Sequence, residues 1–282
     1  MGDTLRSERS DEWTSDEIKL RLGCSTIVFG LDRLLEIEDI VQMREVGITK
    51  IEICALGTPG HVEIQNRPHI LQVMSECEKQ GVSVVSMHSP NLPYDSDKED
   101  IRRNAVSEGV LAAKLAEEFG AKVLVCHFRL DKPSEESVRD MLDQLQGSSI
   151  KLAIENGKDL SEYTSFVDRI GSDQFGMVVD IGHTRDQDGV NPFVKKERAR
   201  ENMAQCGERL IHLHLHDWAS RDHVSPLDGS IQWGEIFAAF KDIAYEGVFM
   251  LIDCICGESK FAINAEQIGF DGRLVKCGKC GK

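Results

Sequence analysis

The sequence predicts an α/β protein built as a (β/α)8 TIM barrel, and two observations carry this prediction. Short apolar runs alternate with segments of helical periodicity eight times over roughly 230 residues, which is the repeat of this fold. The runs are almost continuously apolar, as expected of parallel strands that are buried on both faces. The expected strands cover residues 22–29, 50–55, 82–87, 122–126, 150–154, 176–179, 210–215 and 248–252.

Helical patterns fill the intervals between the expected strands. Apolar residues recur at positions 34, 35, 37, 40, 41 and 43 of the segment 34–46, and the longest such pattern covers residues 101–119. Glycines at positions 47, 81, 120, 147, 171 and 247 each stand before a strand, where a glycine commonly ends the preceding helix. Residues 1–20 are charged and show no such pattern. We therefore expect a flexible leader at 1–20, the barrel at 21–253 and a short extension at 254–282.

The composition limits the classes of partner. The chain of 282 residues is long enough to bury a large core. Its 48 acidic and 33 basic residues give a formal net charge of −15, which repels phosphate backbones, and no basic patch offsets it. We therefore expect no nucleic-acid partner. The sequence also contains no run of about 18 apolar residues, so no membrane span is expected.

The cysteines indicate the compartment. Nine cysteines, an odd number, are scattered through a chain whose first residues show no apolar secretion signal. Free or metal-bound thiols in a reducing environment therefore fit better than a disulfide framework. The expected localisation is cytoplasmic.

The seventh expected strand carries an unusual row of histidines. His212, His214 and His216 alternate with aliphatic residues, so one face of the strand is aliphatic and the other is imidazole. The row ends at Asp217, before a long loop. Imidazoles in such a row are typical of a strand that is directed at a metal ion or a polar substrate.

Polar side chains also stand at the ends of the other expected strands. In a (β/α)8 barrel the active site lies at the mouth formed by the carboxyl ends of the strands, so these side chains are expected to converge there. They are Glu52, His88, His127, Glu155, Asp180 with His183, His214 and Asp253.

Glutamate, aspartate and histidine without a thiolate make a site of oxygen and nitrogen donors for a divalent metal ion. Mn²⁺, Mg²⁺, Co²⁺ and Zn²⁺ all suit such donors. The preferred ligands are Glu155, Asp180, His214 and Asp253, one from each of four strands in the second half of the barrel. A metal ion there could polarise a carbonyl and stabilise an enediolate while a carboxylate moves the proton. The sequence contains no GxGxxG, P-loop or GxSxG motif, which leaves nucleotide binding or serine hydrolysis by those routes without support.

An ordered series of motifs resembles the xylose isomerase-like barrel family. The motifs are VVSMHSP at 84–90, KVLVCHF at 122–128, KLAIEN at 151–156, MVVDIGH at 177–183, and LIHLHLHDW followed by DHVSPLDGSIQW in the segment 210–233. The likeness covers residues 22–253, and the family contains sugar isomerases and epimerases as well as an apurinic-site endonuclease. The resemblance implies a metal-dependent isomerase or epimerase that acts on a sugar or sugar phosphate through a metal-stabilised enediolate.

The resemblance also implies roles for several of the residues at the mouth. Glu155, Asp180, His214 and Asp253 match the family's metal ligands, and the two outer carboxylates, Glu155 and Asp253, match its acid–base pair. The residues expected to bind substrate are Glu52, His88, His127, His183 and His223. The expected partner is a small sugar or sugar phosphate, and the formation of a homo-oligomer stays open.

Three positions depart from the family pattern. Asp253 stands where the family usually has Glu, one methylene longer, and this bears on proton transfer at that side. The loop reads SPLDG at 225–229, where the family has a sequence similar to PPGEG. In the endonuclease branch an Asp stands two residues before the loop histidine, whereas here Arg221 occupies that position, next to Asp222.

Two alternatives to the epimerase therefore stay open. The same histidines could hold three zinc ions, as in a zinc-dependent apurinic-site endonuclease similar to endonuclease IV. The shorter carboxylate of Asp253 would also suit a barrel that binds a sugar-like ligand without catalysis.

The residues after Asp253 predict a second, structural zinc site. Cys254 and Cys256 are separated by residues 257–276 from a second pair, Cys277 and Cys280. Paired cysteines at such a separation resemble a small zinc ribbon. This extension stands in place of an eighth amphipathic helix, for which the sequence shows no convincing pattern.

Overall fold

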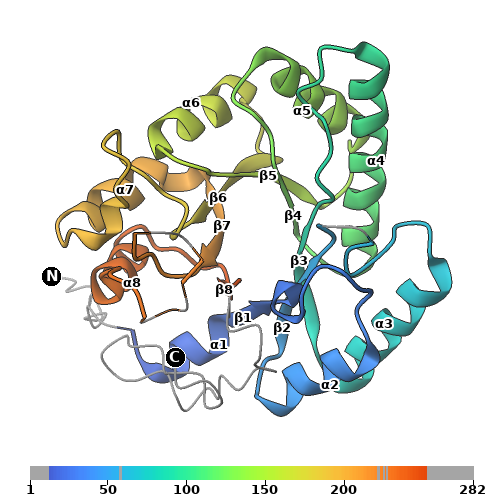
Figure 1. Ribbon diagram of the computed structural model, residues 1–282, viewed down its shortest axis with the longest axis horizontal. Helices are drawn as coiled ribbons and strands as arrows, with labels where there is room; N and C mark the ends of the chain where they lie inside the picture. The colour runs from blue at the N-terminus through green and yellow to red at the C-terminus, as the bar shows by residue number, and fades with distance from the viewer. Residues whose placement is uncertain (1–12, 57–58, 221–222, 225, 227, 253–282) are drawn as a thin grey trace, which may run out of the picture.

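The eight strands of the computed structural model close into one parallel barrel in the order β1-β2-β3-β4-β5-β6-β7-β8, and the helices form a ring around it (Figure 1). The structure describes residues 13–56, 59–220, 223–224, 226 and 228–252. The strands are β1 (Leu22–Ser25), β2 (Lys50–Cys54), β3 (Ser83–His88), β4 (Val123–Cys126), β5 (Lys151–Glu155), β6 (Phe175–Asp180), β7 (Leu210–Leu215) and β8 (Phe249–Leu251). The fold class predicted from the repeat of apolar runs is confirmed.

The helices begin and end at residues that satisfy their free backbone groups. Asn66, Asp131 and Asp159 accept backbone N–H groups at the starts of α3, α5 and α6, and Gly81 and Gly171 end α3 and α6 in the left-handed conformation. The α-helices are α1 (Ser15–Arg21), α2 (Ile37–Glu45), α3 (Arg67–Gln80), α4 (Glu99–Glu118), α5 (Lys132–Gln144), α6 (Leu160–Ile170), α7 (Arg198–Cys206) and α8 (Trp233–Asp242). The 3₁₀ helices are η1 (Thr26–Phe29), η2 (Pro192–Val194) and η3 (Gly207–Arg209).

The first strand is shorter than its apolar run. The run 22–29 predicts one strand, whereas β1 ends at Ser25 and the rest of the run forms η1. Thr26 explains the turn, because its hydroxyl contacts His61 Nδ1 at 2.6 Å and accepts the Cys54 backbone N–H at 2.9 Å. These contacts hold η1 against the end of β2. The other seven strands begin and end within one residue of the expected ranges.

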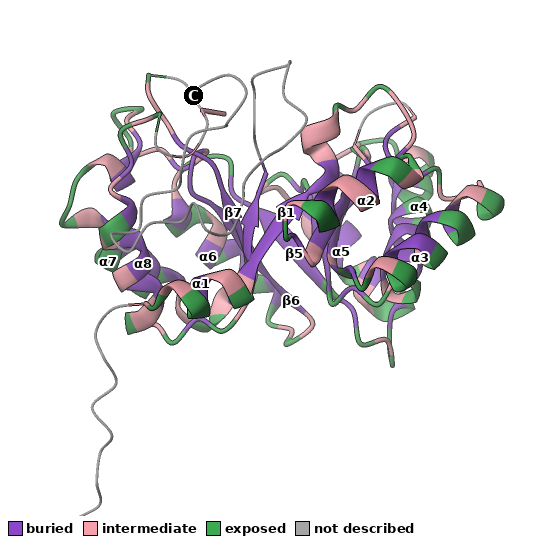
Figure 2. Ribbon diagram, turned by 90° about the horizontal axis from the view of Figure 1, so that it is seen from below, coloured by how far each residue is buried: buried purple, intermediate pink, exposed green. Residues whose placement is uncertain are grey.

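The interior of the barrel has an apolar part and a polar part. Val123, Val125, Ala153 and Val178 form a small buried cluster separate from the main core. Ala153 stands two residues before Glu155 on β5 and therefore faces the same side of the sheet. Most residues of the strands are buried (Figure 2), and the apolar cluster forms a floor under the polar mouth. The buried polar residues of the mouth are Glu52, Ser86, His88, Glu155, Asp180, His212, His214 and His216.

The flexible leader predicted for residues 1–20 is wrong for the part that the structure describes. α1 lies between α8 and α2 in the ring (Figure 1) and begins with a capping box, in which the side chains of Thr14 and Glu17 bind each other's backbone N–H. Ile18 is buried in the main core. A helix of 7 residues with one buried position shows too little periodicity to be distinguished from a charged leader.

Trp13, directly before α1, is expected to brace the barrel. Its Nε1 donates to the Phe237 carbonyl at 2.7 Å, and its ring packs edge-on against Phe249 with centroids 5.3 Å apart. Trp13→Ala should lower the free energy of unfolding by about 2–3 kcal/mol, because a partly buried ring and one hydrogen bond are lost. Leu20→Ala is the matched control, since that side chain is 71% exposed, and should change stability by less than about 0.5 kcal/mol. Urea unfolding followed by circular dichroism measures both, and equal midpoints for the two variants would contradict the bracing role.

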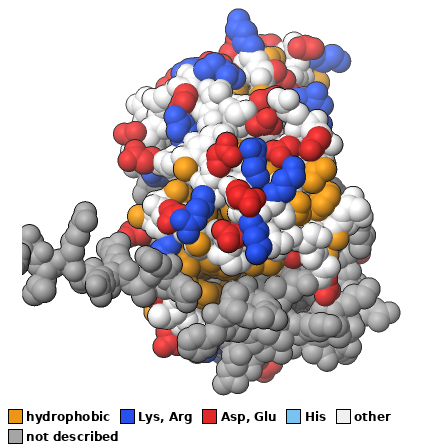
Figure 3. Space-filling model, turned by 90° about the vertical axis from the view of Figure 1, so that its left-hand side faces the viewer, with side chains coloured by type: hydrophobic (Ala, Val, Ile, Leu, Met, Phe, Trp, Pro, Cys, Tyr) orange, Lys and Arg blue, Asp and Glu red, His pale blue; other side chains and the backbone are white. Residues whose placement is uncertain are grey.

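The described face over α7 and α8 mixes charges of both signs (Figure 3). Arg198 pairs with Asp186 and Glu201, and Arg200 pairs with Asp242. Among its described residues this face offers no basic patch of the kind that follows a phosphate backbone.

Several sequence predictions fall on residues outside the description. They concern the fourth predicted metal ligand, the acid–base partner of Glu155, the residues before the loop histidine and the tail zinc site, namely Asp253, Arg221, Asp222, Cys254, Cys256, Cys277 and Cys280. None of the helices that the structure describes has the length and apolar character needed to cross a membrane.

Candidate active site

Glu155 is the centre of the polar mouth. It ends β5, and its Oε2 lies 2.8 Å from His127 Nε2 and 3.1 Å from His88 Nε2, while its Oε1 lies 2.8 Å from His214 Nδ1. Burial alone would raise the pKa of this carboxyl, but the surrounding histidines outweigh burial and hold the pKa well below its ordinary value. Glu155 is therefore an ionised carboxylate enclosed by imidazoles.

Asp180 forms a second group at the end of the next strand. Its Oδ1 accepts the backbone N–H of His183 at 2.9 Å and lies 2.7 Å from His216 Nε2, while its Oδ2 lies 3.1 Å from His183 Nδ1. Burial would raise the pKa of this carboxyl, and the charges of His183 and His216 lower it below its ordinary value. His183 Nδ1 also lies 3.8 Å from Glu155 Oε1, so one imidazole joins the two carboxylates.

Asn156 fixes the strand ends that carry these carboxylates. Its Oδ1 accepts the backbone N–H of Asp180 at 2.7 Å, and its Nδ2 donates to Thr184 Oγ1 at 3.0 Å. The side chain is buried and follows Glu155 directly. It therefore links the end of β5 to the end of β6 on the side where both carboxylates lie.

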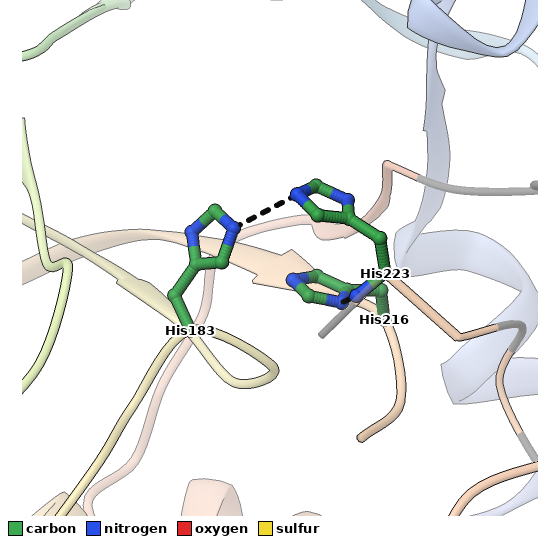
Figure 4. A group of neighbouring side chains, drawn as sticks. All are labelled: His183, His216 and His223. Atoms are coloured by element: carbon green, nitrogen blue, oxygen red, sulfur yellow. Dashed lines mark hydrogen bonds between the residues drawn. The ribbon is translucent and has the colours of Figure 1, made fainter. Parts of the chain in front are cut away.

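Three histidines gather beside Asp180 (Figure 4). His183 Nε2 and His223 Nε2 lie 2.9 Å apart, and the rings of His216 and His223 stack with centroids 4.5 Å apart. The His223 backbone N–H donates to His216 Nδ1 at 2.9 Å from a left-handed residue with a φ of 53°. The loop after β7 thus returns over the end of its own strand. One nitrogen of each ring lies within 4.8 Å of the others, close enough for a shared metal ion.

Asp217, at the end of the histidine row, holds this loop in place. Its Oδ1 accepts the backbone N–H groups of Trp218 at 2.7 Å and Ile231 at 3.0 Å, and its Oδ2 accepts Trp233 Nε1–H at 2.8 Å. Gly229 passes so close that a Cβ there would lie 2.0 Å from Oδ1, which explains the glycine. Asp217 is therefore a brace of the loop that brings the histidines together.

The donors at the mouth fit a divalent metal ion. Glu155 belongs to two groups whose ligand atoms lie within 4.8 Å of one another, one with His88 and His214 and one with Asp180 and His183. Asp180 Oδ2 is buried, lies 3.1 Å from His183 Nδ1 and accepts no hydrogen bond from the described residues. Buried carboxylate oxygens usually accept hydrogen bonds, so this oxygen has capacity left for a cation. Oxygen and imidazole donors of this kind suit Mn²⁺, Mg²⁺, Co²⁺ or Zn²⁺.

A pocket of about 360 Å³ opens onto these donors. It is lined by His127, Phe128, Glu155, Asn156, Gly157, Tyr163 and His183. A larger hollow of about 880 Å³ is lined by Lys122 and Lys151, which stand before or at the amino ends of β4 and β5, and it contains none of the mouth residues. The smaller pocket is therefore the candidate substrate site.

The structure brings most of the residues expected at the mouth together. Glu155 and Asp180 end β5 and β6, and His214 is the last residue but one of the neighbouring strand β7. Each of the three contacts another member of the polar cluster. The residues expected to bind substrate divide into two sets. His88, His127, His183 and His223 surround Glu155 and Asp180 near the pocket. Glu52 lies apart from them, fully buried beneath His214, and does not line the pocket.

His212, His216 and Ser86 belong to the polar cluster but are not among the site residues expected from the sequence. The alternation of His212, His214 and His216 already placed all three on one face, and that signal could have found the first two. The Ser86 hydroxyl donates to Glu52 Oε2 at 2.8 Å. The sequence of β3 alone does not predict this contact.

The chain is similar to one family model and to several known proteins. The family model of the xylose isomerase-like TIM barrel matches residues 40–268. The uncharacterized protein MJ1311 of Methanocaldococcus jannaschii is 22% identical over 268 residues, which cover 86% of each chain. The D-psicose 3-epimerase of Enterocloster bolteae is 30% identical over 90 residues, which cover 32% of this chain and 26% of that enzyme.

A solved structure shares the whole fold. The crystal structure of D-psicose 3-epimerase with D-tagatose from Clostridium cellulolyticum aligns with a TM-score of 0.69 at 17% identity, over 87% of this chain and 89% of that one. The family model matches well over half of the sequence, and the chain belongs to the xylose isomerase-like TIM barrel family.

Proposed function

We propose that this protein is a divalent-metal-dependent epimerase or isomerase of a small sugar or sugar phosphate. The observation that carries the proposal is the ionised, buried carboxylate of Glu155, surrounded by three imidazoles at the edge of a pocket. Two of the similar proteins have names that describe sugar epimerases, which supports the same class of substrate.

Glu155, Asp180 and His214 would hold the metal ion, with Asp253, two residues after the end of β8 in the sequence, as the fourth ligand. A bound divalent cation would polarise the substrate carbonyl and stabilise the negative charge of an enediolate. The depressed pKa values of Glu155 and Asp180 keep both side chains ionised at neutral pH, which is the form that binds a cation.

The proton of the substrate would pass through Glu155 and its neighbours. Glu155 can accept the proton because it is ionised, and His127 Nε2 lies 2.8 Å from the same carboxylate oxygen. The His127 side chain is 42% exposed toward the mouth, so it can relay a proton between Glu155 and the pocket. We assign Asp253 the opposite face of the substrate carbon. Acid–base assistance of this kind is typically worth about 10²–10⁴ in rate.

A second candidate function, an apurinic-site endonuclease with several zinc ions, is favoured by the additional histidine clusters. His183, His216 and His223 make a group of three ligands next to Asp180, and His88 with His127 makes another pair beside Glu155. A net charge of −15 opposes DNA binding. The epimerase is therefore the first proposal.

Exchange of substrate hydrogen with solvent deuterium distinguishes the epimerase from the endonuclease. The purified chain, loaded with Mn²⁺, Co²⁺ or Mg²⁺, is incubated in heavy water with a panel of free and phosphorylated ketoses. We expect deuterium at the carbon next to the carbonyl and the appearance of an epimer or isomer, since the proton must leave and return. Absence of exchange across the panel together with nicking of DNA at abasic sites would instead support the endonuclease. If neither activity appears, the barrel binds a ligand without catalysis, and restored exchange in Asp253→Glu would identify the shorter carboxylate as the cause.

A further inference from the structure

A buried carboxylate beneath the candidate metal site has no part in the acid–base chemistry proposed above. Glu52 is the middle residue of β2 and has no exposed surface. Its Oε2 accepts the Ser86 hydroxyl at 2.8 Å and lies 3.0 Å from His214 Nε2 and 3.2 Å from His212 Nε2. Three side chains from β3 and β7 therefore converge on one oxygen from β2, across the interior of the barrel.

The two nitrogens of His214 face two different carboxylates. Nδ1 lies 2.8 Å from Glu155 Oε1 at the mouth, and Nε2 lies 3.0 Å from Glu52 Oε2 below it. A neutral imidazole carries one N–H, whereas an ionised carboxylate only accepts hydrogen bonds. An N–H that donates to Glu52 leaves the lone pair on Nδ1, and an unprotonated nitrogen is what a metal ion requires.

The network is arranged to hold Glu52 in one position. Ser86 and His212 bind the same oxygen as His214, while Oε1 is buried and has no hydrogen-bond partner among the described residues. A buried carboxylate with one unsatisfied oxygen costs stability relative to an apolar side chain of the same size. Its presence directly under His214 therefore points to a role in the site and not in folding.

We propose that Glu52 is a positioning residue that completes a carboxylate–histidine–metal triad with His214. It holds His214 as the tautomer protonated on Nε2 and directs Nδ1 at the ion between the strand ends. The inference rests on the proposed function in one respect, namely that an ion binds at the mouth. It replaces the role in substrate binding that is expected for Glu52 from the sequence.

Ion affinity tests this role separately from activity. Glu52→Gln keeps the size of the side chain but removes its charge. It also replaces one accepting oxygen by an amide group that donates hydrogen bonds. We expect Co²⁺ binding to the full chain, measured by calorimetry, to weaken about 10–100-fold, as for other partners of metal-binding histidines. The visible absorption of bound Co²⁺ should change as well, because the orientation of one ligand changes. Glu38→Gln, an exposed residue of α2, is the matched control and should bind Co²⁺ like the wild type.

A second measurement does not depend on the folding of any Glu52 variant. In wild-type protein labelled with ¹⁵N-histidine and loaded with Zn²⁺, the nitrogen spectrum of His214 should show a proton on Nε2 and a bound metal on Nδ1. The His214→Asn variant assigns the signals by their loss. A metal on Nε2, or a Glu52→Gln variant with unchanged Co²⁺ affinity and spectrum, would overturn the triad while leaving the proposed function intact. A wild type that binds no ion at the mouth would overturn both.

Discussion

Glu155→Gln is expected to abolish proton exchange of the substrate and to release the metal ion. The change removes the one negative charge that contacts His88, His127 and His214 together. General acid–base assistance alone is worth about 10²–10⁴, and the loss of the ion adds to this, so the exchange rate should fall at least about 1,000-fold.

The Glu155 experiment needs two readouts and one control. Deuterium incorporation measures the chemistry, and elemental analysis after dialysis measures the ion. Glu162→Gln, an exposed position on α6 of the same strand–helix unit, should leave both unchanged. Exchange that persists in Glu155→Gln at more than a tenth of the wild-type rate, with the barrel intact by circular dichroism, would mean that another group moves the proton.

Asp180→Ala should remove the metal ion from the mouth. The side chain is fully buried, and its Oδ2 accepts no hydrogen bond from the described residues, although it lies 3.1 Å from His183 Nδ1. Loss of a charged ligand should exceed the 10–100-fold effect typical of residues that only support a ligand, so we expect ion affinity to fall by more than about 100-fold. Asp180→Asn, which keeps the shape, should behave alike because it removes the charge.

Asp173→Asn controls for the Asp180 variants. Asp173 is exposed and stands two residues before the start of β6, at the opposite end of the strand from Asp180. Ion content measured by mass spectrometry on equal amounts of folded protein compares the three variants. Full occupancy in Asp180→Ala would assign the ion to other residues, in the first place to the cluster of His183, His216 and His223.

The barrel could be predicted from the sequence because its signals are repeated. Helical patterns follow the apolar runs through most of the chain, and six glycines stand before strands, so an error in one unit does not disturb the others. The two elements that the sequence did not predict correctly, η1 and α1, depend on contacts between a few individual residues. η1 depends on contacts of Thr26 with His61 and with the backbone of Cys54, and α1 depends on the capping pair of Thr14 and Glu17. The pattern of apolar residues does not indicate such contacts.

The candidate site could be predicted at the level of residues but not of atoms. The position of Glu155, Asp180 and His214 at strand ends follows from the period of the strands. The sequence cannot show that Glu52 lies below His214 while His88 and His127 flank Glu155, because these relations depend on which strands face each other across the barrel. The role of Asp217 could not be predicted either, because its partners Ile231 and Trp233 follow a long loop.

Anomalous diffraction from a crystal of the full chain grown with Zn²⁺ tests the central claim most directly. We expect one strong peak at the barrel mouth, in contact with carboxylate oxygens of Glu155 and Asp180 and with Nδ1 of His214. A mouth without a peak, or a set of separate peaks at the His88–His127 pair and among His183, His216 and His223, would contradict a mononuclear epimerase site.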